Sequence, residues 1–133
     1  MIGRRRFRLT RSLKFTIIAI GKLKAEYAKL GCAQFLKRLS RSYRVEHVEL
    51  KDVRRGRGGS VSQWKAEEAQ LIQAHIPRGA FVVALDERGK EWTSTELAEW
   101  IDEQQNRSVS HIAFILGGPD GLEAELRRSA RRV

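Results

Sequence analysis

Residues 112–121 have the sequence IAFILGGPDG, an uncharged apolar run followed by three glycines, a proline and an aspartate. A short apolar run of this kind predicts a buried strand over Ile112–Leu116. The residues Gly117-Gly118-Pro119-Asp120-Gly121 then predict a turn. A helix is expected to begin near Leu122 and to continue to Val133. The unit is therefore strand, turn, helix.

The same unit occurs three more times toward the amino terminus. The predicted strands are Lys14–Ile20 (KFTIIAI), Arg44–Leu50 and Ala80–Leu85 (AFVVAL), and the predicted helices are Ala25–Leu39, about Val61 to Ile76, and the segment after Thr93. Ser60 with Gln63, and Thr93 with Glu96, have the spacing of capping boxes. Strands separated by single helices imply a parallel sheet with right-handed crossovers. We predict one α/β domain with a mainly parallel sheet flanked by helices.

Two of these elements carry a further expectation about packing. The segment Ala80–Leu85 has no charged residue, which favours a central position in the sheet. The helix Ala25–Leu39 has an apolar face that contains Ala28, Phe35 and Leu39, and Trp100 lies on the apolar stripe of the helix after Thr93. We expect Trp64 and Trp100 to lie in the core.

The composition supports one globular domain with a polyanionic partner. The chain has 133 residues, of which 41% are hydrophobic and 32% charged, as in compact single domains. Its 26 Lys and Arg exceed its 16 Asp and Glu, which gives a net charge of +10. Such an excess favours nucleic acid or an acidic membrane surface as partner.

The positive charge is concentrated in three places. The basic clusters are the five arginines of residues 1–12, then Arg54, Arg55 and Arg57 in a glycine-rich loop, and finally Arg127, Arg128, Arg131 and Arg132. They are equally explained by contact with RNA and by solvated surface segments. Residues 1–12 are predicted to be a mobile extension, and residues 13–133 to form the domain.

Cysteine content and hydropathy narrow the class of protein. Cys32 is the only cysteine, which excludes an intrachain disulfide and suits a reducing cytoplasm. No Cys or His pair has zinc spacing, so no metal is expected. The apolar runs are far shorter than the roughly 20 residues that span a bilayer, so no membrane association is expected.

Ligands of parallel α/β sheets bind beyond the carboxyl ends of the strands, which makes two connections candidates. Gly117–Gly121 either exposes backbone groups to a ligand or forms a tight turn. Asp86 and Glu87 either accept from ligand hydroxyls or form a charged turn. Trp92 is the aromatic beside them that can stack on a base. No nucleophile or paired carboxylate supports hydrolysis, and the three histidines are expected to be structural or on the surface.

Three segments together resemble a known family. They are KFTIIAIGKLK at 14–24, ALDERGKEWTSTELA at 84–98 and FILGGPDGL at 114–122. In this order and spacing they resemble the RlmH-type ribosomal RNA methyltransferases of the SPOUT class, over about residues 13–132. The resemblance implies a cytoplasmic homodimer that uses S-adenosylmethionine to methylate N3 of a pseudouridine in 23S ribosomal RNA on the assembled ribosome.

The resemblance also implies which residues hold the cofactor. In that family the leucine that ends the central strand and the first glycine of the turn bind it, here Leu85 and Gly117, and Gly118 is expected to allow the same close approach. Arg54, Arg55 and Arg57 are predicted phosphate anchors and Trp92 a predicted RNA contact. No residue is assigned as the base that removes the imide proton.

The sequence departs from the family at its end. Family members continue with a further strand, a loop and a last helix that thread the trefoil knot and complete the cofactor pocket, and here this segment is absent. We therefore expect a SPOUT domain with an incomplete knot segment. The alternatives are a non-catalytic basic rRNA-binding fragment of the same fold and, with less support, a nucleotide-binding α/β module of another class. Binding of S-adenosylmethionine separates them.

Overall fold

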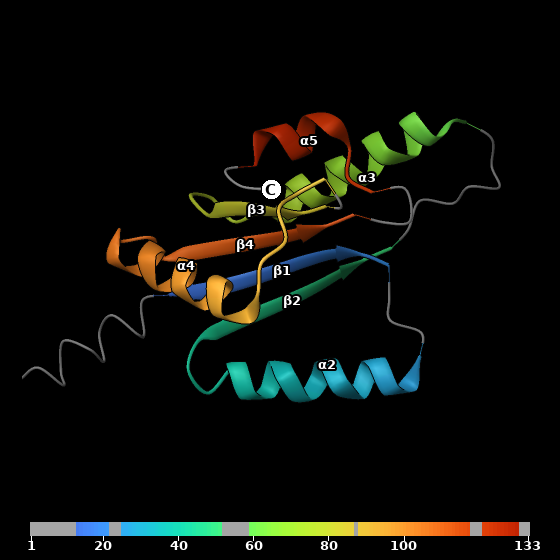
Figure 1. Ribbon diagram of the computed structural model, residues 1–133. Coiled ribbons are helices and arrows are strands. Elements are labelled where there is room, and N and C mark those ends of the chain that lie inside the picture. Colours follow the sequence, from blue (N-terminus) through green and yellow to red (C-terminus); the bar gives the residue numbers. More distant parts are fainter. Residues whose placement is uncertain (1–12, 22–24, 52–58, 87, 118–120, 131–133) are drawn as a thin grey trace, which may run out of the picture.

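The computed structural model describes residues 13–21, 25–51, 59–86, 88–117 and 121–130. Within them strands and helices alternate, as the sequence predicts (Figure 1). The elements are β1 (Lys14–Ile20), α2 (Glu26–Leu39), β2 (Arg44–Leu50), α3 (Val61–His75), β3 (Phe81–Leu85), α4 (Ser94–Asn106), β4 (His111–Leu116) and α5 (Ala124–Ser129). The predicted mobility of residues 1–12 concerns residues outside this description.

The last helix is shorter than predicted. It begins at Ala124, and Glu123 caps it by accepting from the backbone N–H of Leu126 at 2.8 Å. Ala130 has extended backbone angles, φ −69° and ψ 145°. Helical geometry therefore ends at Ser129.

All four strands are parallel, in the order β2-β1-β4-β3. The central strands are β1 and β4, so the prediction that Ala80–Leu85 is central was wrong. This strand lacks charge because both of its faces are buried: Val83 packs on one side and Ala84 on the other. The absence of charge in a strand indicates that helices bury both of its faces. It does not indicate whether the strand has one or two neighbouring strands.

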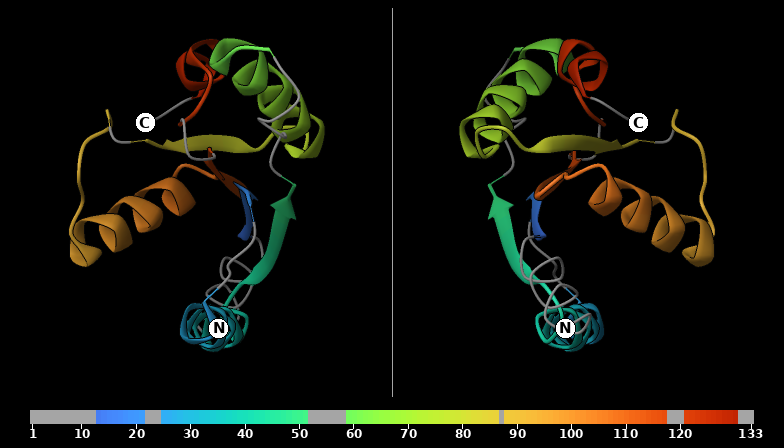
Figure 2. Two further views of the ribbon diagram at one scale, coloured as in Figure 1. Left: turned by 90° about the vertical axis from the view of Figure 1, so that its right-hand side faces the viewer. Right: turned by 90° about the vertical axis from the view of Figure 1, so that its left-hand side faces the viewer.

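Each face of the sheet has its own core, since successive strand residues point to opposite sides. On one face Ile18, Ile20 and Ile115 pack with Ile72 of α3 and Leu126 of α5. On the other face Phe15, Val83 and Ile112 pack with Trp100 of α4. Figure 2 shows α4 on one side of the sheet, with α3 and α5 on the other.

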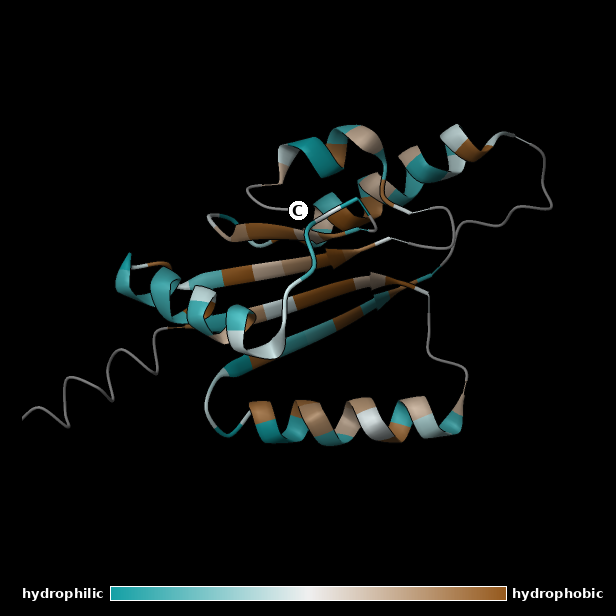
Figure 3. Cartoon of the chain, viewed as in Figure 1, coloured by the Kyte–Doolittle hydropathy of each residue, from teal (hydrophilic) through white to brown (hydrophobic). Residues whose placement is uncertain are grey.

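Helix α2 does not join either core. It has no buried residue, and Tyr27, Leu30 and Phe35 are 83%, 66% and 67% exposed. It lies beyond β2, the most hydrophilic of the strands (Figures 1 and 3). The apolar face with Ala28, Phe35 and Leu39 therefore belongs to neither core.

Both predicted capping boxes are confirmed. Ser60 Oγ accepts from the backbone N–H of Gln63 at 3.3 Å, and Thr93 Oγ1 accepts from that of Glu96 at 3.1 Å. The side chains of Gln63 and Glu96 in turn accept hydrogen bonds from the backbone N–H groups of Ser60 and Thr93, at 3.0 Å and 2.9 Å. The starts of α3 and α4 are thus fixed by local sequence.

Candidate functional site

The carboxyl ends of β3 and β4 lie side by side. Leu85 is in register with Leu116, and Gly117 follows directly. The structure therefore brings Leu85 next to Gly117, two residues that lie far apart in the sequence. Leu85 is 46% exposed, so an apolar side chain faces solvent at the edge where ligands of parallel sheets bind.

Gly117 is required by the turn itself. A Cβ placed there lies 2.5 Å from the carbonyl carbon of Gly121 and 2.8 Å from the backbone nitrogen of Leu122. Gly121 has φ +82°, which favours glycine. Local packing and backbone conformation therefore account for these two glycines, and contact of their backbone with a ligand stays a prediction. Gly118 lies outside the described residues.

Asp86 holds the connection that follows β3. Its side chain is only 2% exposed, and its Oδ1 accepts from the backbone N–H of Arg88 at 2.9 Å and lies 3.4 Å from the Arg88 guanidinium. Burial by itself raises the pKa of Asp86, but hydrogen bonds from the backbone N–H groups of Arg88 and Leu122, with the charges of Arg88 and Arg127, bring it below the ordinary value of 3.8.

Asp86 also lies next to the turn after β4. The backbone N–H of Leu122 contributes to the lowering of its pKa, and a Cβ on Gly121 would lie 3.8 Å from Asp86 Oδ2. Sequence reasoning considered Asp86 only as a ligand acceptor or as part of a charged turn. The spacing of 36 residues between Asp86 and Leu122 gives no signal of this contact.

Trp92, the predicted RNA contact, lies against Trp100 of α4. Its ring is 5.3 Å from that of Trp100, centroid to centroid, and it is partly buried against the core cluster that contains Trp100. The surface hollow beside it is lined by Trp92, Trp100, Glu96, Glu99, Asp102, Glu103 and Asn106. Four carboxylates there disfavour an RNA phosphate. Stacking of Trp92 on a base stays a prediction, with this geometry against it.

The remaining predicted contacts fall outside the site as described. Arg54, Arg55 and Arg57 lie outside the described residues, so their role as phosphate anchors stays a prediction. Among the residues that the structure describes, no group of three or more His, Cys, Asp or Glu side chains could hold a metal ion. In the same ranges no helix has both the length and the apolar character to cross a membrane.

The parallel sheet, its flanking helices and the glycine turn define an α/β domain whose candidate ligand site lies beyond the ends of β3 and β4. The family profile described as "Predicted SPOUT methyltransferase" matches residues 13–133. The chain belongs to the SPOUT methyltransferase family, which confirms the predicted resemblance and fold class.

Relatives within this family are named for one activity. The chain is 38% identical over 113 residues to "Ribosomal RNA large subunit methyltransferase H" of Hydrogenovibrio crunogenus, with 85% of this chain and 72% of the relative covered. Proteins of the same name match from Paraburkholderia phymatum, at 38% identity over 89% and 75% of the two chains, and from Neisseria meningitidis serogroup C, at 37% over 91% and 77%.

Proposed function

We propose that this chain is an S-adenosylmethionine-dependent methyltransferase that acts on N3 of a pseudouridine in 23S ribosomal RNA. The observation that carries the proposal is the placement of Leu85 beside Gly117, within a chain of the SPOUT family. The relatives named ribosomal RNA large subunit methyltransferase H supply the substrate class. We place the reaction on the assembled ribosome, in the cytoplasm.

The residues at this edge fit the cofactor. Leu85 offers exposed apolar surface to a flat heterocycle, and the half-buried Leu116 lies beside it. The backbone of Gly117 offers a polar group without a side chain over it. An apolar wall with one or two fixed polar groups is the usual make-up of a small-molecule site.

When bound, the cofactor supplies an activated methyl group, so the protein needs mainly to orient it against the base nitrogen. In this scheme Leu85 and Gly117 bind the cofactor and orient it. Asp86 holds their two connections at a fixed separation through Arg88 and Leu122. The chain's own base for the imide proton is left unassigned.

The proposal includes a homodimer, which the resemblance implies. A second copy needs apolar surface that the fold leaves uncovered, and α2 offers Tyr27, Leu30 and Phe35. Sedimentation of the wild type and of Phe35→Ser tests this part. We expect the variant to shift toward the monomer, and an unchanged monomer–dimer equilibrium argues against α2 as the contact.

The enzymatic part is tested by calorimetry with S-adenosylmethionine, and with adenosine triphosphate as the control ligand. We expect selective binding of S-adenosylmethionine by the wild type, followed by methyl transfer to ribosomes. No binding by the folded protein contradicts the proposal and favours a non-catalytic RNA-binding role.

A matched pair of variants locates the site. Leu85→Ala removes an apolar contact worth about 1 kcal/mol, so we expect binding to weaken roughly five-fold. Leu71→Ala is the control, since Leu71 is also a leucine, 40% exposed, but lies on α3. Equal affinities of the two variants place the cofactor elsewhere.

A further inference from the structure

At the amino ends of the strands, the connecting segments carry cations and no carboxylates of their own, although Glu103 at the end of α4 lies 3.5 Å from Arg107. The segments that enter the strands there are Leu13–Lys14, the α2–β2 connection at residues 40–43 with the first residue of β2, the α3–β3 connection at 76–80, and the α4–β4 connection at 107–110. They contain no Asp or Glu. The cations in these segments are Lys14, Arg41, Arg44, Arg78 and Arg107. We call the surface that these five residues form the amino edge.

These cations are available to a partner. The four arginines are exposed, and Lys14 is half-buried. Arg107 lies 3.5 Å from Glu103, but both side chains are more than half exposed, and a pair of this kind stabilises little. In the part of the chain that the structure describes, the other four have no carboxylate within ion-pair distance.

Strand pairing gathers the charges along one line. Lys14 is in register with Arg44 on one side and with His111 on the other. Neighbouring strands are about 4.8 Å apart, so the amino ends of four strands span roughly 15 Å. The arginine-rich residues 1–12 are joined to this same edge through the buried Leu13.

His111 reports on the charge at this edge. Its Nε2 lies 2.7 Å from Thr16 Oγ1. Its pKa is lowered, first by burial and then by the charge of Lys14 and, to a smaller extent, Arg44, while Glu46 opposes the shift. Two cations of the amino edge therefore act on this ring, and one exposed carboxylate of β2, Glu46, partly offsets them.

The β3–α4 connection, at the opposite edge, has a different charge pattern. It contains the carboxylates Asp86, Glu87 and Glu91 together with Arg88 and Lys90, and Asp86 pairs with Arg88 at 3.4 Å. Positive charge there is partly neutralised within the same connection. Among the described residues, the cations of the amino edge are the less neutralised set.

We propose that the amino edge is a second binding surface for large-subunit ribosomal RNA, at the other end of the sheet from the candidate cofactor site. The proposal rests on the proposed function. Four of the five cations are arginines, whose planar guanidinium matches phosphate oxygens in two-pronged contacts. None of the exposed large apolar residues lies in these connections, which favours RNA over a membrane surface that needs apolar insertion.

The test compares two triple variants on the full chain. Arg41→Gln/Arg78→Gln/Arg107→Gln removes one loop cation from each of three connections of the amino edge. Lys29→Gln/Lys65→Gln/Arg128→Gln is the control and removes three cations from α2, α3 and α5. Binding to purified large ribosomal subunits is measured over a series of potassium chloride concentrations, with thermal melts to verify folding.

Each phosphate contact contributes about 0.7 to 0.9 to the slope of log affinity against log salt. We expect the amino-edge variant to lose about 2 from the wild-type slope, and the control variant to lose less than 1. Equal slopes for the two variants overturn the inference, as does a wild type that binds phosphatidylserine vesicles but no large subunits.

Calorimetry with S-adenosylmethionine separates this inference from the proposed function. If the wild type binds the cofactor while the two triple variants have equal salt slopes, only the inference fails. If the wild type does not bind the cofactor while the amino-edge variant alone loses salt dependence, only the proposed enzymatic function fails.

Discussion

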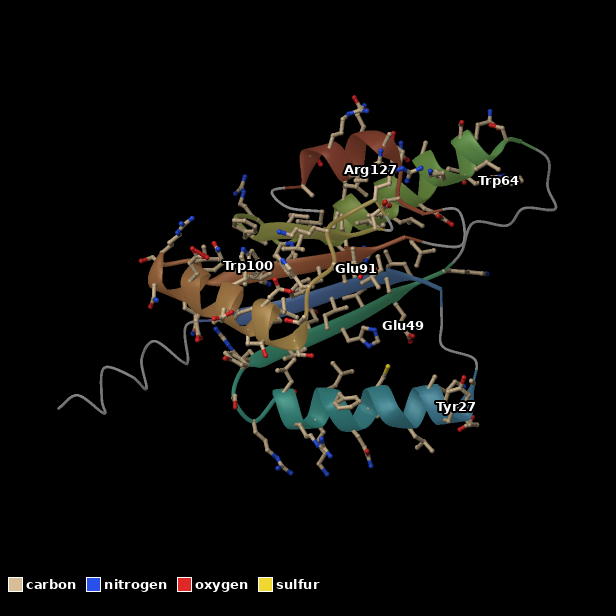
Figure 4. The ribbon with its side chains drawn as sticks, viewed as in Figure 1. Tyr27, Glu49, Trp64, Glu91, Trp100 and Arg127 are labelled. Carbon is tan, nitrogen blue, oxygen red and sulfur yellow. The ribbon has the colours of Figure 1, made fainter. Side chains whose placement is uncertain are left out.

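Helices α2 and α4 have nearly the same length, 14 and 13 residues, and both carry apolar side chains. Helix α4 buries Trp100 and Gln104, whereas α2 buries none of its residues. The most exposed aromatic of α2 is Tyr27, and the buried aromatic of α4 is Trp100 (Figure 4). An apolar stripe therefore predicts that a segment forms a helix, but not what covers it.

The two helices also differ in how they begin. Helix α4 has a complete capping box, and its connection is held by Asp86. The N-cap of α2 is Ala25, which forms no side-chain cap. Helices gain most of their stability from tertiary packing. Helix α2 therefore lacks the stabilisation that α4 gains from its capping box and from its buried residues.

The largest expected effect is from removing the packed aromatic. Trp100→Ala leaves a cavity against Phe81 and Trp92, whose rings lie 5.5 Å and 5.3 Å away, and we expect a loss of about 3 to 5 kcal/mol. Phe35→Ala in α2 is the control, with a change of less than about 0.5 kcal/mol when unfolding is measured at concentrations at which the chain is monomeric. Denaturant unfolding measures both, and equal losses mean that α2 is packed after all.

A pH-dependent effect is expected at Asp86. Because its pKa is lowered in the folded state, its contribution is present above the unfolded value and is lost as the pH falls through the folded value. We expect Asp86→Asn to cost about 1 to 2 kcal/mol at neutral pH. The difference from the wild type should shrink as the pH falls below about 4. A difference that does not depend on pH contradicts the role of the charge.

A smaller effect is expected from the cap of α4. Thr93→Ala removes the acceptor for the backbone N–H of Glu96 and should cost about 1 kcal/mol. Thr93→Ser keeps the oxygen and is the matched control. If the two variants unfold at the same denaturant concentration, the capping box contributes nothing to the difference between α4 and α2.

The smallest effect is a gain in α2. A Cβ at Gly31 meets no atom within 4 Å, so Gly31→Ala should stabilise this helix by about 0.5 to 1 kcal/mol. Hydrogen exchange of the α2 amides should slow, while the midpoint of global unfolding hardly moves. An equal shift in both measurements means that α2 unfolds together with the sheet.

The local features were predictable from the sequence. The four strand–helix units follow from the spacing of apolar residues, and the capping boxes from the pairs Ser60–Gln63 and Thr93–Glu96. The sequence GGPDG predicts a turn, and the close backbone contacts around Gly117 explain why this position requires a glycine. Each of these depends on interactions between residues a few positions apart, so the sequence shows them directly.

Only the tertiary structure decided how those units are arranged. The edge position of β3, the exposure of α2 and the link from Asp86 to Leu122 depend on the order of the strands. The amino edge does so too, because strand pairing brings together cations that lie up to 93 positions apart, from Lys14 to Arg107. The residues next to a strand in the sequence do not determine which distant strand pairs with it.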